Sequence, residues 1–385
     1  MTIMTRRELV QETKRRYLKA NKKEKTKILD EFCANTKFHR KHAIRIFRTD
    51  YDYNRIEKRG RKKREKIYSN EFILFCIKIW EVLDYPCGDR LQPSLVEMTK
   101  VLERNDELKS FDLNKEVWQK LNKISAKTLN RRLKREREIR HLKRNRGTTK
   151  HGSLLKSSVP IRITDWDRDE LGFMEMDTVA HNGGDPSGEH IYSLDLVEIS
   201  AGWSEQIAVL GRGERGIVRA IDNIKKEVPF EIKGFDSDTG SEFVNWHFVR
   251  YCKKHNHGFT RSRPAMKNDN AYVEEKNNTH IRRWLGYRRY DTKKQLKLIN
   301  NLYRQELRLF NNFFRPVMKI KEKIKVNNSI CKKKYDRAKT PYQRLLDSGK
   351  ISKEKQKELN KIYLSLNPVQ LKKKIDEKIK QILNS

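Results

Sequence analysis

The stretch that decides the fold is "EIKGFDSDTGSEFVNWHFVRYCKKH", residues 231–255. Its opening residues are typical of a short strand, and the residues from Ser241 onward have the periodicity of a helix. The glycine before Ser241 lets the chain turn from strand to helix, and Ser241 can cap that helix. Two aspartates, Asp236 and Asp238, lie at the end of the predicted strand, in a chain that otherwise favours positive charge.

The segments on either side of this stretch extend it into a sheet. Three runs before it alternate like strands, with a dense turn signal at 181–189 between the first two. The order βββαβαβα predicts a mixed five-stranded sheet flanked by helices. The predicted strands are 171–179, 190–199, 203–210, 231–237 and 258–262, and the predicted helices are 214–227, 241–255 and 268–290.

Three acidic residues fall where such a sheet gathers functional groups. Asp177 lies in the first strand, Asp238 ends the fourth, and Glu274 follows Asp238 with 35 residues between them (274 − 238 − 1). Converging carboxylates repel one another, and a buried unpaired one is costly. Divalent cations remove that conflict, and Mg²⁺ prefers oxygen ligands. Two such ions about 3.5–4 Å apart can support in-line phosphoryl transfer. In a chain whose positive charge also favours binding to DNA, we expect such a cluster to be a site for cutting and joining DNA strands.

Residues 171–290 resemble the catalytic core of the retroviral-integrase-type DDE transposases of bacterial insertion sequences. The resemblance lies in "MEMDTVAH", "GFDSDTGSEF" and "TRSRPAMKNDNAYVEEKNNTHIRR". It implies a ribonuclease-H-like fold, and it implies that Asp177, Asp238 and Glu274 are the catalytic residues and bind two Mg²⁺ ions, for which Mn²⁺ is expected to substitute. The 35-residue gap is the usual one in that family.

Residues next to the three acids have less certain roles. Asp236 supports the strand or turn in one interpretation and is an auxiliary ligand in the other. His181 has either a structural role or a contact with substrate or metal-bound water. Glu275 points about 100° away from Glu274 around the helix, so only Glu274 faces the cluster. The pair at 269–270 is interpreted as a helix cap.

The charge of the chain predicts a polyanionic partner. Its 385 residues include 88 Lys+Arg and 51 Asp+Glu, which gives a net charge of +37. Such an excess favours double-stranded DNA, and here the element ends and the target DNA are the expected partners. Two helix-turn-helix units with basic second helices are predicted in the first 143 residues. The expected DNA contacts are Arg40, Lys41, Arg45, Arg131, Arg132, Lys134, Arg135, Lys267, Lys276 and Arg282.

Helix caps and boundaries complete the predicted organisation. Thr36 is predicted to cap the second helix of the first unit, and Ser125 the basic helix of the second. Beyond residue 291 the chain is predicted to be helical and to end in a lysine-rich tail of low periodicity. The predicted segments are a helix-turn-helix unit at 1–56, a basic linker at 57–69, a second helix-turn-helix unit at 70–143, a linker at 144–170, the catalytic core at 171–290 and a mostly helical basic region at 291–385.

Other classes of protein fit less well. The tetrapeptide Asp-Thr-Gly-Ser at 238–241 is also found in aspartic proteases, but those enzymes pair two such aspartates in an all-β fold. This chain has a single copy, followed by a predicted helix. The cysteines form no C-x-x-C pair, and no run of eighteen apolar residues occurs. We therefore expect a soluble, cytoplasmic, nucleoid-associated bacterial protein without a membrane partner.

The function predicted from the sequence is a DDE transposase that binds the terminal inverted repeats of a mobile element. It would cleave strands at the element ends and transfer them into target DNA by transesterification. Because two ends are handled together, a homodimer or larger assembly on DNA is expected. Two alternatives stay open: a ribonuclease-H-like nuclease without strand transfer, and a DNA-binding regulator that has lost catalysis.

Overall fold

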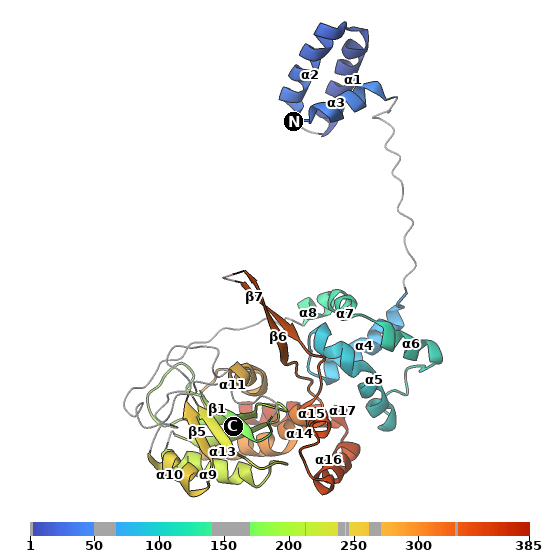
Figure 1. Cartoon of the computed structure of the whole chain (residues 1–385). Coiled ribbons are helices and arrows are strands. Elements are labelled where there is room, and N and C mark those ends of the chain that lie inside the picture. Colours follow the sequence, from blue (N-terminus) through green and yellow to red (C-terminus); the bar gives the residue numbers. More distant parts are fainter. Residues whose placement is uncertain are drawn as a thin grey trace. The chain divides into compact units, whose positions relative to one another are not determined.

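The computed structural model describes residues 3–49, 67–140, 170–211, 213–237, 243, 246–261, 271–327 and 330–385. The chain divides into two compact units, Met1–Ile67 and Tyr68–Ser385 (Figure 1). Most of the two predicted linkers, 57–66 of the first and 144–169 of the second, lies outside the described residues. Across the described parts, no helix is both long enough and apolar enough to cross a membrane.

The first unit contains three helices, α1 (Ile3–Lys19), α2 (Lys22–Thr36) and α3 (Arg40–Arg48). Helix α2 begins at a capping box, in which the Asn21 side chain accepts the Glu24 N–H and the Glu24 carboxylate accepts the Asn21 N–H, each at 3.0 Å. Phe32 and Phe47 pack edge to face, with ring centroids 4.8 Å apart. The rest of this core is Val10, Tyr17, Ile28, Leu29, Ala43 and Ile46.

The predicted cap of α3, which is the basic second helix of the predicted helix-turn-helix unit, is wrong. Thr36 ends α2, and its hydroxyl donates to the Phe32 carbonyl. His39 is the N-cap of α3, and its ring accepts the Lys41 N–H at 3.3 Å. The shift arises because Lys37 ends α2 in a left-handed conformation (φ 60°), which uses three residues to turn between the helices.

The second unit begins with five helices, α4 (Asn70–Val82), α5 (Gly88–Arg104), α6 (Lys115–Lys123), α7 (Ala126–Arg132) and α8 (Lys134–Ile139). Ser125 caps α7 as predicted, by accepting the Thr128 N–H. Helix α5 meets α7 closely at Gly88, because a Cβ there would lie 2.3 Å from the Ala126 carbonyl oxygen. The Gly88 N–H donates to the Asn130 side chain at 2.8 Å, which fixes the two helices together.

A mixed five-stranded sheet forms the centre of the second unit. Its strands are β1 (Phe173–Ala180), β2 (Ile191–Glu198), β3 (Ser204–Leu210), β4 (Gly234–Ser237) and β5 (Gly258–Arg261), in the spatial order β3-β2-β1-β4-β5. The pairs β1–β2 and β2–β3 are antiparallel, and β1–β4 and β4–β5 are parallel. This order and these directions are those of the ribonuclease-H-like fold, so the predicted fold is confirmed.

The sheet has one apolar and one polar face, because successive side chains of a strand point to opposite sides. Met174, Met176 and Phe235 are fully buried on the apolar face, and the Phe235 ring packs on Phe248 with ring centroids 5.5 Å apart. The polar face carries Glu175, Asp177 and Asp195. The helices around the sheet are α9 (Glu214–Lys225), α10 (Trp246–Lys254), α11 (Ala271–Lys276), the π-helix η1 (Asn277–Arg282) and α12 (Arg283–Leu285).

The chain after residue 290 continues to pack on the sheet, through α13 (Lys293–Leu302), the π-helix η2 (Tyr303–Leu307) and α14 (Arg308–Phe313). Two amide side chains cover the outer edge of β3. Asn300 exchanges two hydrogen bonds with the Ala208 backbone, at 2.8 and 2.9 Å, and Asn312 does the same at Ser204. These amides satisfy an edge that would otherwise be open to another strand.

The C-terminal region is mostly helical, as predicted, but it also contains a hairpin that the sequence prediction missed. The hairpin strands are β6 (Ile320–Asn327) and β7 (Ile330–Tyr335), and the helices are α15 (Pro341–Ser348), α16 (Lys353–Ser365) and α17 (Pro368–Leu383). The prediction of a tail with low periodicity is wrong. Helix α17 buries Leu371, Ile375 and Ile382, which recur at helical spacing on one side.

Candidate active site

Asp177 lies on β1, the central strand of the sheet, on its polar face. Its side chain is partly exposed, whereas the adjacent Met176 is fully buried on the opposite face. Its Oδ1 accepts the Thr178 N–H at 2.7 Å. Its Oδ2 accepts the side-chain amide of Asn277 at 2.6 Å. The carboxylate is therefore held in a fixed orientation while still reaching solvent.

Glu274 lies on α11, the helix that packs beside β1, and its side chain is exposed. The start of this helix is held by Glu175, two residues before Asp177 in β1. Glu175 is 1% exposed, and its Oε2 accepts the backbone N–H groups of Tyr272 at 3.0 Å and Val273 at 3.2 Å. A buried carboxylate that accepts helix-start N–H groups fixes where that helix begins. Glu175 thus places the segment that carries Glu274.

The far end of the same helical segment is also attached to β1. Arg282, the last residue of η1, donates to the Ala180 carbonyl at 2.8 Å and to the Gly286 carbonyl at 3.3 Å. Its guanidinium lies 4.7 Å from the ring centre of Tyr287. Glu175, Asn277 and Arg282 therefore fix the helix to β1 at its start, middle and end. These contacts argue against the predicted role of Arg282 as a DNA contact.

Asn277 also places a buried amide oxygen close to the Asp177 carboxylate. Its Oδ1 is buried and has no hydrogen-bond partner among the described residues. The amide cannot be reversed at low cost, because its oxygen would then oppose the Asp177 carboxylate. A buried acceptor beside a carboxylate suits a cation or its hydration water. An oxygen-rich set of this kind fits Mg²⁺ better than a softer metal.

Asp238 lies outside the described residues. The last described residue before it is Ser237 of β4, which pairs with Met176, the neighbour of Asp177 in β1. Among the described residues, no three His, Cys, Asp or Glu side chains form a metal-binding group. The two acids on β1 and α11 are therefore the part of the predicted triad that the structure describes.

Asp236 is fully buried on β4, where it pairs with Glu175 of β1 and Thr260 of β5. Its Oδ1 accepts the Thr260 hydroxyl at 2.5 Å. This contact ties the two short parallel strands together, which favours the interpretation of Asp236 as support for the strand.

His181 follows β1 and is also fully buried. Its Nε2 lies 2.8 Å from the Ser193 hydroxyl, which in turn lies 2.7 Å from the Tyr303 hydroxyl. Burial, together with the charges of Arg282 and His190, lowers the pKa of His181 to about 3. A neutral, enclosed imidazole of this kind favours the structural interpretation of His181 over a substrate contact.

Asp195 of β2 lies directly across from Asp177 and is fully buried. Burial raises the pKa of Asp195 to about 7, against the opposing effects of a 2.9 Å hydrogen bond from Gln206 and the charge of Lys276. Lys276 is only 6% exposed, and burial lowers its pKa to about 7. An ammonium enclosed in this way cannot meet a DNA phosphate, which argues against the predicted DNA contact of Lys276.

The other predicted DNA contacts lie on the helical parts of the chain. In the first unit Arg40 pairs with Asp30, and Arg45 lies 3.1 Å from His42. In the second unit Leu129 and Leu133 are buried, and the predicted contacts of α7 and α8 lie away from that buried side. Lys267 lies outside the described residues. The exposed or partly exposed members are Arg40, Lys41, Arg45, Arg131, Arg132, Lys134 and Arg135.

The helical part α4–α8 contacts the segment of Glu274 at two places. Arg90 of α5 forms an ion pair with Glu275, the neighbour of Glu274 on α11. Burial raises the pKa of Glu275, but the charges of Lys276 and Arg90 outweigh it and lower the pKa overall.

The second contact is made by Asp84, in the turn between α4 and α5. Asp84 is 6% exposed, accepts from Arg283 of α12 at 3.1 Å and lies 3.8 Å from Arg315. Both Asp84 and Tyr85 have left-handed backbones, with φ of 61° and 60°. Each such residue costs free energy that its surroundings must offset. Sequence reasoning missed this junction because the partners are about two hundred residues apart.

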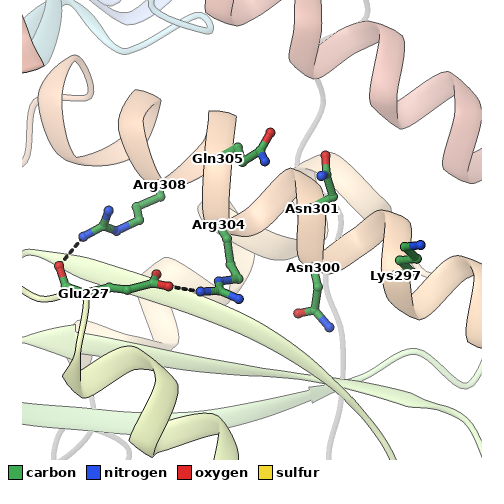
Figure 2. Close-up of a pocket in the computed structure, with 7 residues that line it drawn as sticks. All are labelled: Glu227, Lys297, Asn300, Asn301, Arg304, Gln305 and Arg308. Carbon is green, nitrogen blue, oxygen red and sulfur yellow. Dashed lines mark hydrogen bonds and ion pairs between the residues drawn. The ribbon is translucent and has the colours of Figure 1, made fainter.

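A pocket of about 420 Å³ lies elsewhere, on α13, η2 and α14 (Figure 2). Arg308 donates to both Glu205 oxygens, at 2.8 and 2.9 Å, and Arg304 pairs with Glu227. Asn300 is engaged with the β3 edge. The pocket groups thus already serve the packing of these helices, and the pocket is separate from Asp177 and Glu274. Its lining is Glu227, Lys297, Asn300, Asn301, Arg304, Gln305 and Arg308.

The strand order and the position of the two acids define a protein with a ribonuclease-H-like domain between helical regions. No family model matches the chain. It is 34% identical over 336 residues to the uncharacterized protein y4rM of Sinorhizobium fredii (strain NBRC 101917 / NGR234), and the match covers 86% of this chain and 93% of y4rM. The chain belongs to the same family as y4rM.

Two solved structures share similarity with part of the chain. The catalytic core domain of BIV integrase matches 46% of this chain and 95% of its own, with a TM-score of 0.31 and 15% identity. A simian T-cell lymphotropic virus intasome in complex with PP2A regulatory subunit B56 gamma matches 52% of this chain and 57% of its own, with a TM-score of 0.32 and 12% identity. The fold assignment rests on strand order and direction, and these low scores add no functional argument.

Proposed function

We propose that this protein is a DDE transposase, a polynucleotidyl transferase that cleaves DNA strands at the ends of a mobile element and joins them to target DNA. The observation that carries the proposal is the placement of Asp177 and Glu274. One lies on the central strand, the other on the helix beside it, and Glu175, Asn277 and Arg282 fix that helix to the strand. The residue after β4 is Asp238, the third acid of the proposed triad.

The proposed site uses carboxylates as ligands and has no covalent nucleophile. Asp177, Asp238 and Glu274 would hold two Mg²⁺ ions, with Mn²⁺ as a substitute. When bound, the ions would activate an attacking hydroxyl and stabilise the leaving oxygen. Asn277 orients the Asp177 carboxylate and offers its own buried oxygen next to it. Glu175 keeps the Glu274 helix in register with β1.

The proposed substrate is duplex DNA. A net charge of +37 favours a polyanion. The basic residues of α3 and of α7–α8 are exposed or partly exposed on helices whose other sides are buried, which suits helix-turn-helix binding of element ends. Asp84 and Arg90 join α4–α8 to the segment of Glu274. Binding of an element end by these helices would therefore be coupled to cleavage at the proposed site. A dimer or larger assembly would hold two ends together.

The decisive experiment compares Glu274→Gln with Glu275→Gln in the purified full chain. The substrate is a labelled duplex that carries the DNA flanking the gene, with Mg²⁺ or Mn²⁺ and a supercoiled plasmid as target. Glu274→Gln is expected to lose cleavage and joining while still binding the duplex. Glu275→Gln is the matched control, because it keeps a hydrogen-bond acceptor for Arg90 and is expected to remain active.

The same assay separates the alternatives. Cleavage without joined product, even from a duplex supplied with a free 3′-hydroxyl end, would indicate a ribonuclease-H-like nuclease. Binding without cleavage by the unaltered protein would indicate a DNA-binding regulator. Full activity of Glu274→Gln would show that the site is assigned wrongly.

A further inference from the structure

The hairpin β6–β7 is a strongly cationic element that the proposed active site does not explain. Residues 320–335 contain six lysines and one glutamate. Lysines often protect exposed strand edges from pairing with other chains. That role needs a charge along each edge, and it does not need lysines opposite one another. The lysines are Lys321, Lys323, Lys325, Lys332, Lys333 and Lys334.

The strand register places two lysines opposite one another at one position of the hairpin. Lys323 pairs with Lys333, and the next pair on the same face places Lys325 opposite Cys331. Like charges directly opposite each other destabilise a ribbon. On the other face, Lys334 lies 3.8 Å from Glu322. The repulsion on the first face would be relieved by a polyanion.

Among the residues whose side chains are described, the hairpin has large apolar groups that packing leaves exposed. Its sheet has β6 and β7 as its described strands, and an isolated two-stranded ribbon is marginal in water. Ile324 is 42% exposed and Tyr335 is 48% exposed. Figure 1 shows the hairpin extending away from the sheet and its helices. A ribbon of this kind gains more from a bound partner than a packed strand pair would.

The base of the hairpin is firmly attached beside the proposed active site. The Lys319 N–H donates to Asp336 at 2.7 Å, which closes the base. The Lys319 ammonium donates to carbonyl groups of the turn between β2 and β3. It also lies 5.9 Å from the ring centre of Tyr272, two residues before Glu274 on α11. The ribbon therefore starts next to the helix that carries Glu274.

We propose that β6–β7 is a DNA-binding arm that contacts the phosphates of duplex DNA through Lys323, Lys325 and Lys333. Phosphate contacts favour lysine, and the major groove of B-DNA admits a two-stranded ribbon. The choice of duplex DNA as partner rests on the proposed function. The arm holds the duplex that enters the site at Asp177 and Glu274.

The test measures binding of a random-sequence duplex by the full chain at several salt concentrations, with and without Lys323→Gln, Lys325→Gln and Lys333→Gln together. Because this variant removes the Lys323–Lys333 repulsion, its thermal stability should stay equal or rise, so lost binding cannot reflect unfolding. The control is Lys353→Gln, Lys373→Gln and Lys374→Gln, which removes the same charge from exposed positions of α16 and α17.

The hairpin variant is expected to bind at least tenfold more weakly than the unaltered protein. Its dependence of log K on log salt should flatten by about 2.7, at about 0.9 for each lost phosphate contact. The control should change little. Equal losses in both variants, or an unchanged slope in the hairpin variant, would overturn the proposal.

A parallel measurement with poly-glutamate tests for an acidic protein partner. If the hairpin variant lost binding to poly-glutamate but kept binding to the duplex, the DNA-binding arm would be ruled out. These measurements read binding alone. If Glu274→Gln stayed active, the proposed function would be wrong. The measured effect of the hairpin variant on DNA binding would still hold.

Discussion

The two faces of the central sheet share the same strands but are built from different chemistry. On one face Met174, Met176 and Phe235 are fully buried, and Phe235 packs on Phe248 of α10. On the other, Glu175 and Asp195 are as deeply buried, yet both are acids with specific hydrogen-bond donors. Burying an acid costs free energy that apolar packing does not. The apolar face therefore supplies stability, and the polar face spends part of it to place Asp177 and Glu274.

The largest expected effect comes from two adjacent residues of β1 on opposite faces. Asp177→Asn should lose cleavage and joining below detection, with little change in stability, because the side chain keeps its shape. Met176→Ala should lose about 2–5 kcal/mol of stability through a cavity, while the folded fraction stays active. Thermal unfolding and the strand-transfer assay measure the two effects. If both variants lost both properties together, the faces would not be functionally separate.

A smaller effect is expected from the acid that holds the start of α11. Glu175→Gln should cost about 1–3 kcal/mol and lower the cleavage rate while DNA binding is kept, because the helix start loses its charged acceptor. Glu198→Gln is the matched control. Glu198 is also fully buried and accepts backbone N–H groups, from Gly172 at 3.2 Å and Ser200 at 2.9 Å. It should lose similar stability with an unchanged rate per folded molecule.

If Glu175→Gln and Glu198→Gln lowered the cleavage rate equally, Glu175 would have no positioning role. Rates should therefore be compared at matched folded fractions, measured by circular dichroism. Binding of the labelled duplex provides the second readout. A simple loss of folded protein would lower both binding and cleavage, whereas a positioning role lowers cleavage alone.

The smallest expected effect is a pH dependence of stability on the polar face. Burial lowers the pKa of His181 to about 3, whereas a histidine in the unfolded chain has a pKa near 6.5. The unfolded chain binds the extra proton between these values, so stability falls as the pH drops from about 6.5 toward 3. His181→Gln should reduce that fall by up to about 1.4 kcal/mol per pH unit. Melting temperatures at pH 7, 6 and 5 measure it.

The exposed His255 provides the comparison for this experiment. His255→Gln should leave the slope of melting temperature against pH unchanged. An equal change of slope in both variants would mean that the acid sensitivity does not arise from burial of His181.

Much of the central sheet was predictable because its signals are local. The alternation in 171–179 and the turn signal before residue 190 place β1 and β2 within two residues of their observed bounds. The assignment of Asp177 and Glu274 also needed only short segments of sequence. The structure adds that both acids lie on neighbouring elements, which local patterns alone do not establish.

Local patterns are least informative where tertiary packing decides. Lys276 and Arg282 have the charge of DNA contacts, but one is buried and the other bonds backbone carbonyls. The positions of both depend on how the π-helix η1 turns, and sequence periodicity assumes an α-helix. The hairpin was missed because its lysines mask the alternation of Ile320, Ile324 and their neighbours. Glu175 was missed because a buried acid two residues from Asp177 has no pattern of its own.

The π-helix η1 also limits how the length of this segment can vary. The helix is fixed to β1 by Glu175 at its start and by Arg282 at its end. Each residue advances an α-helix by about 100° around its axis. Deleting one residue between Asn277 and Arg282 would therefore turn Glu274 by roughly that angle away from Asp177, or else break one attachment. Among members of this family, we expect the segment between Asn277 and Arg282 to vary in sequence but to keep its length.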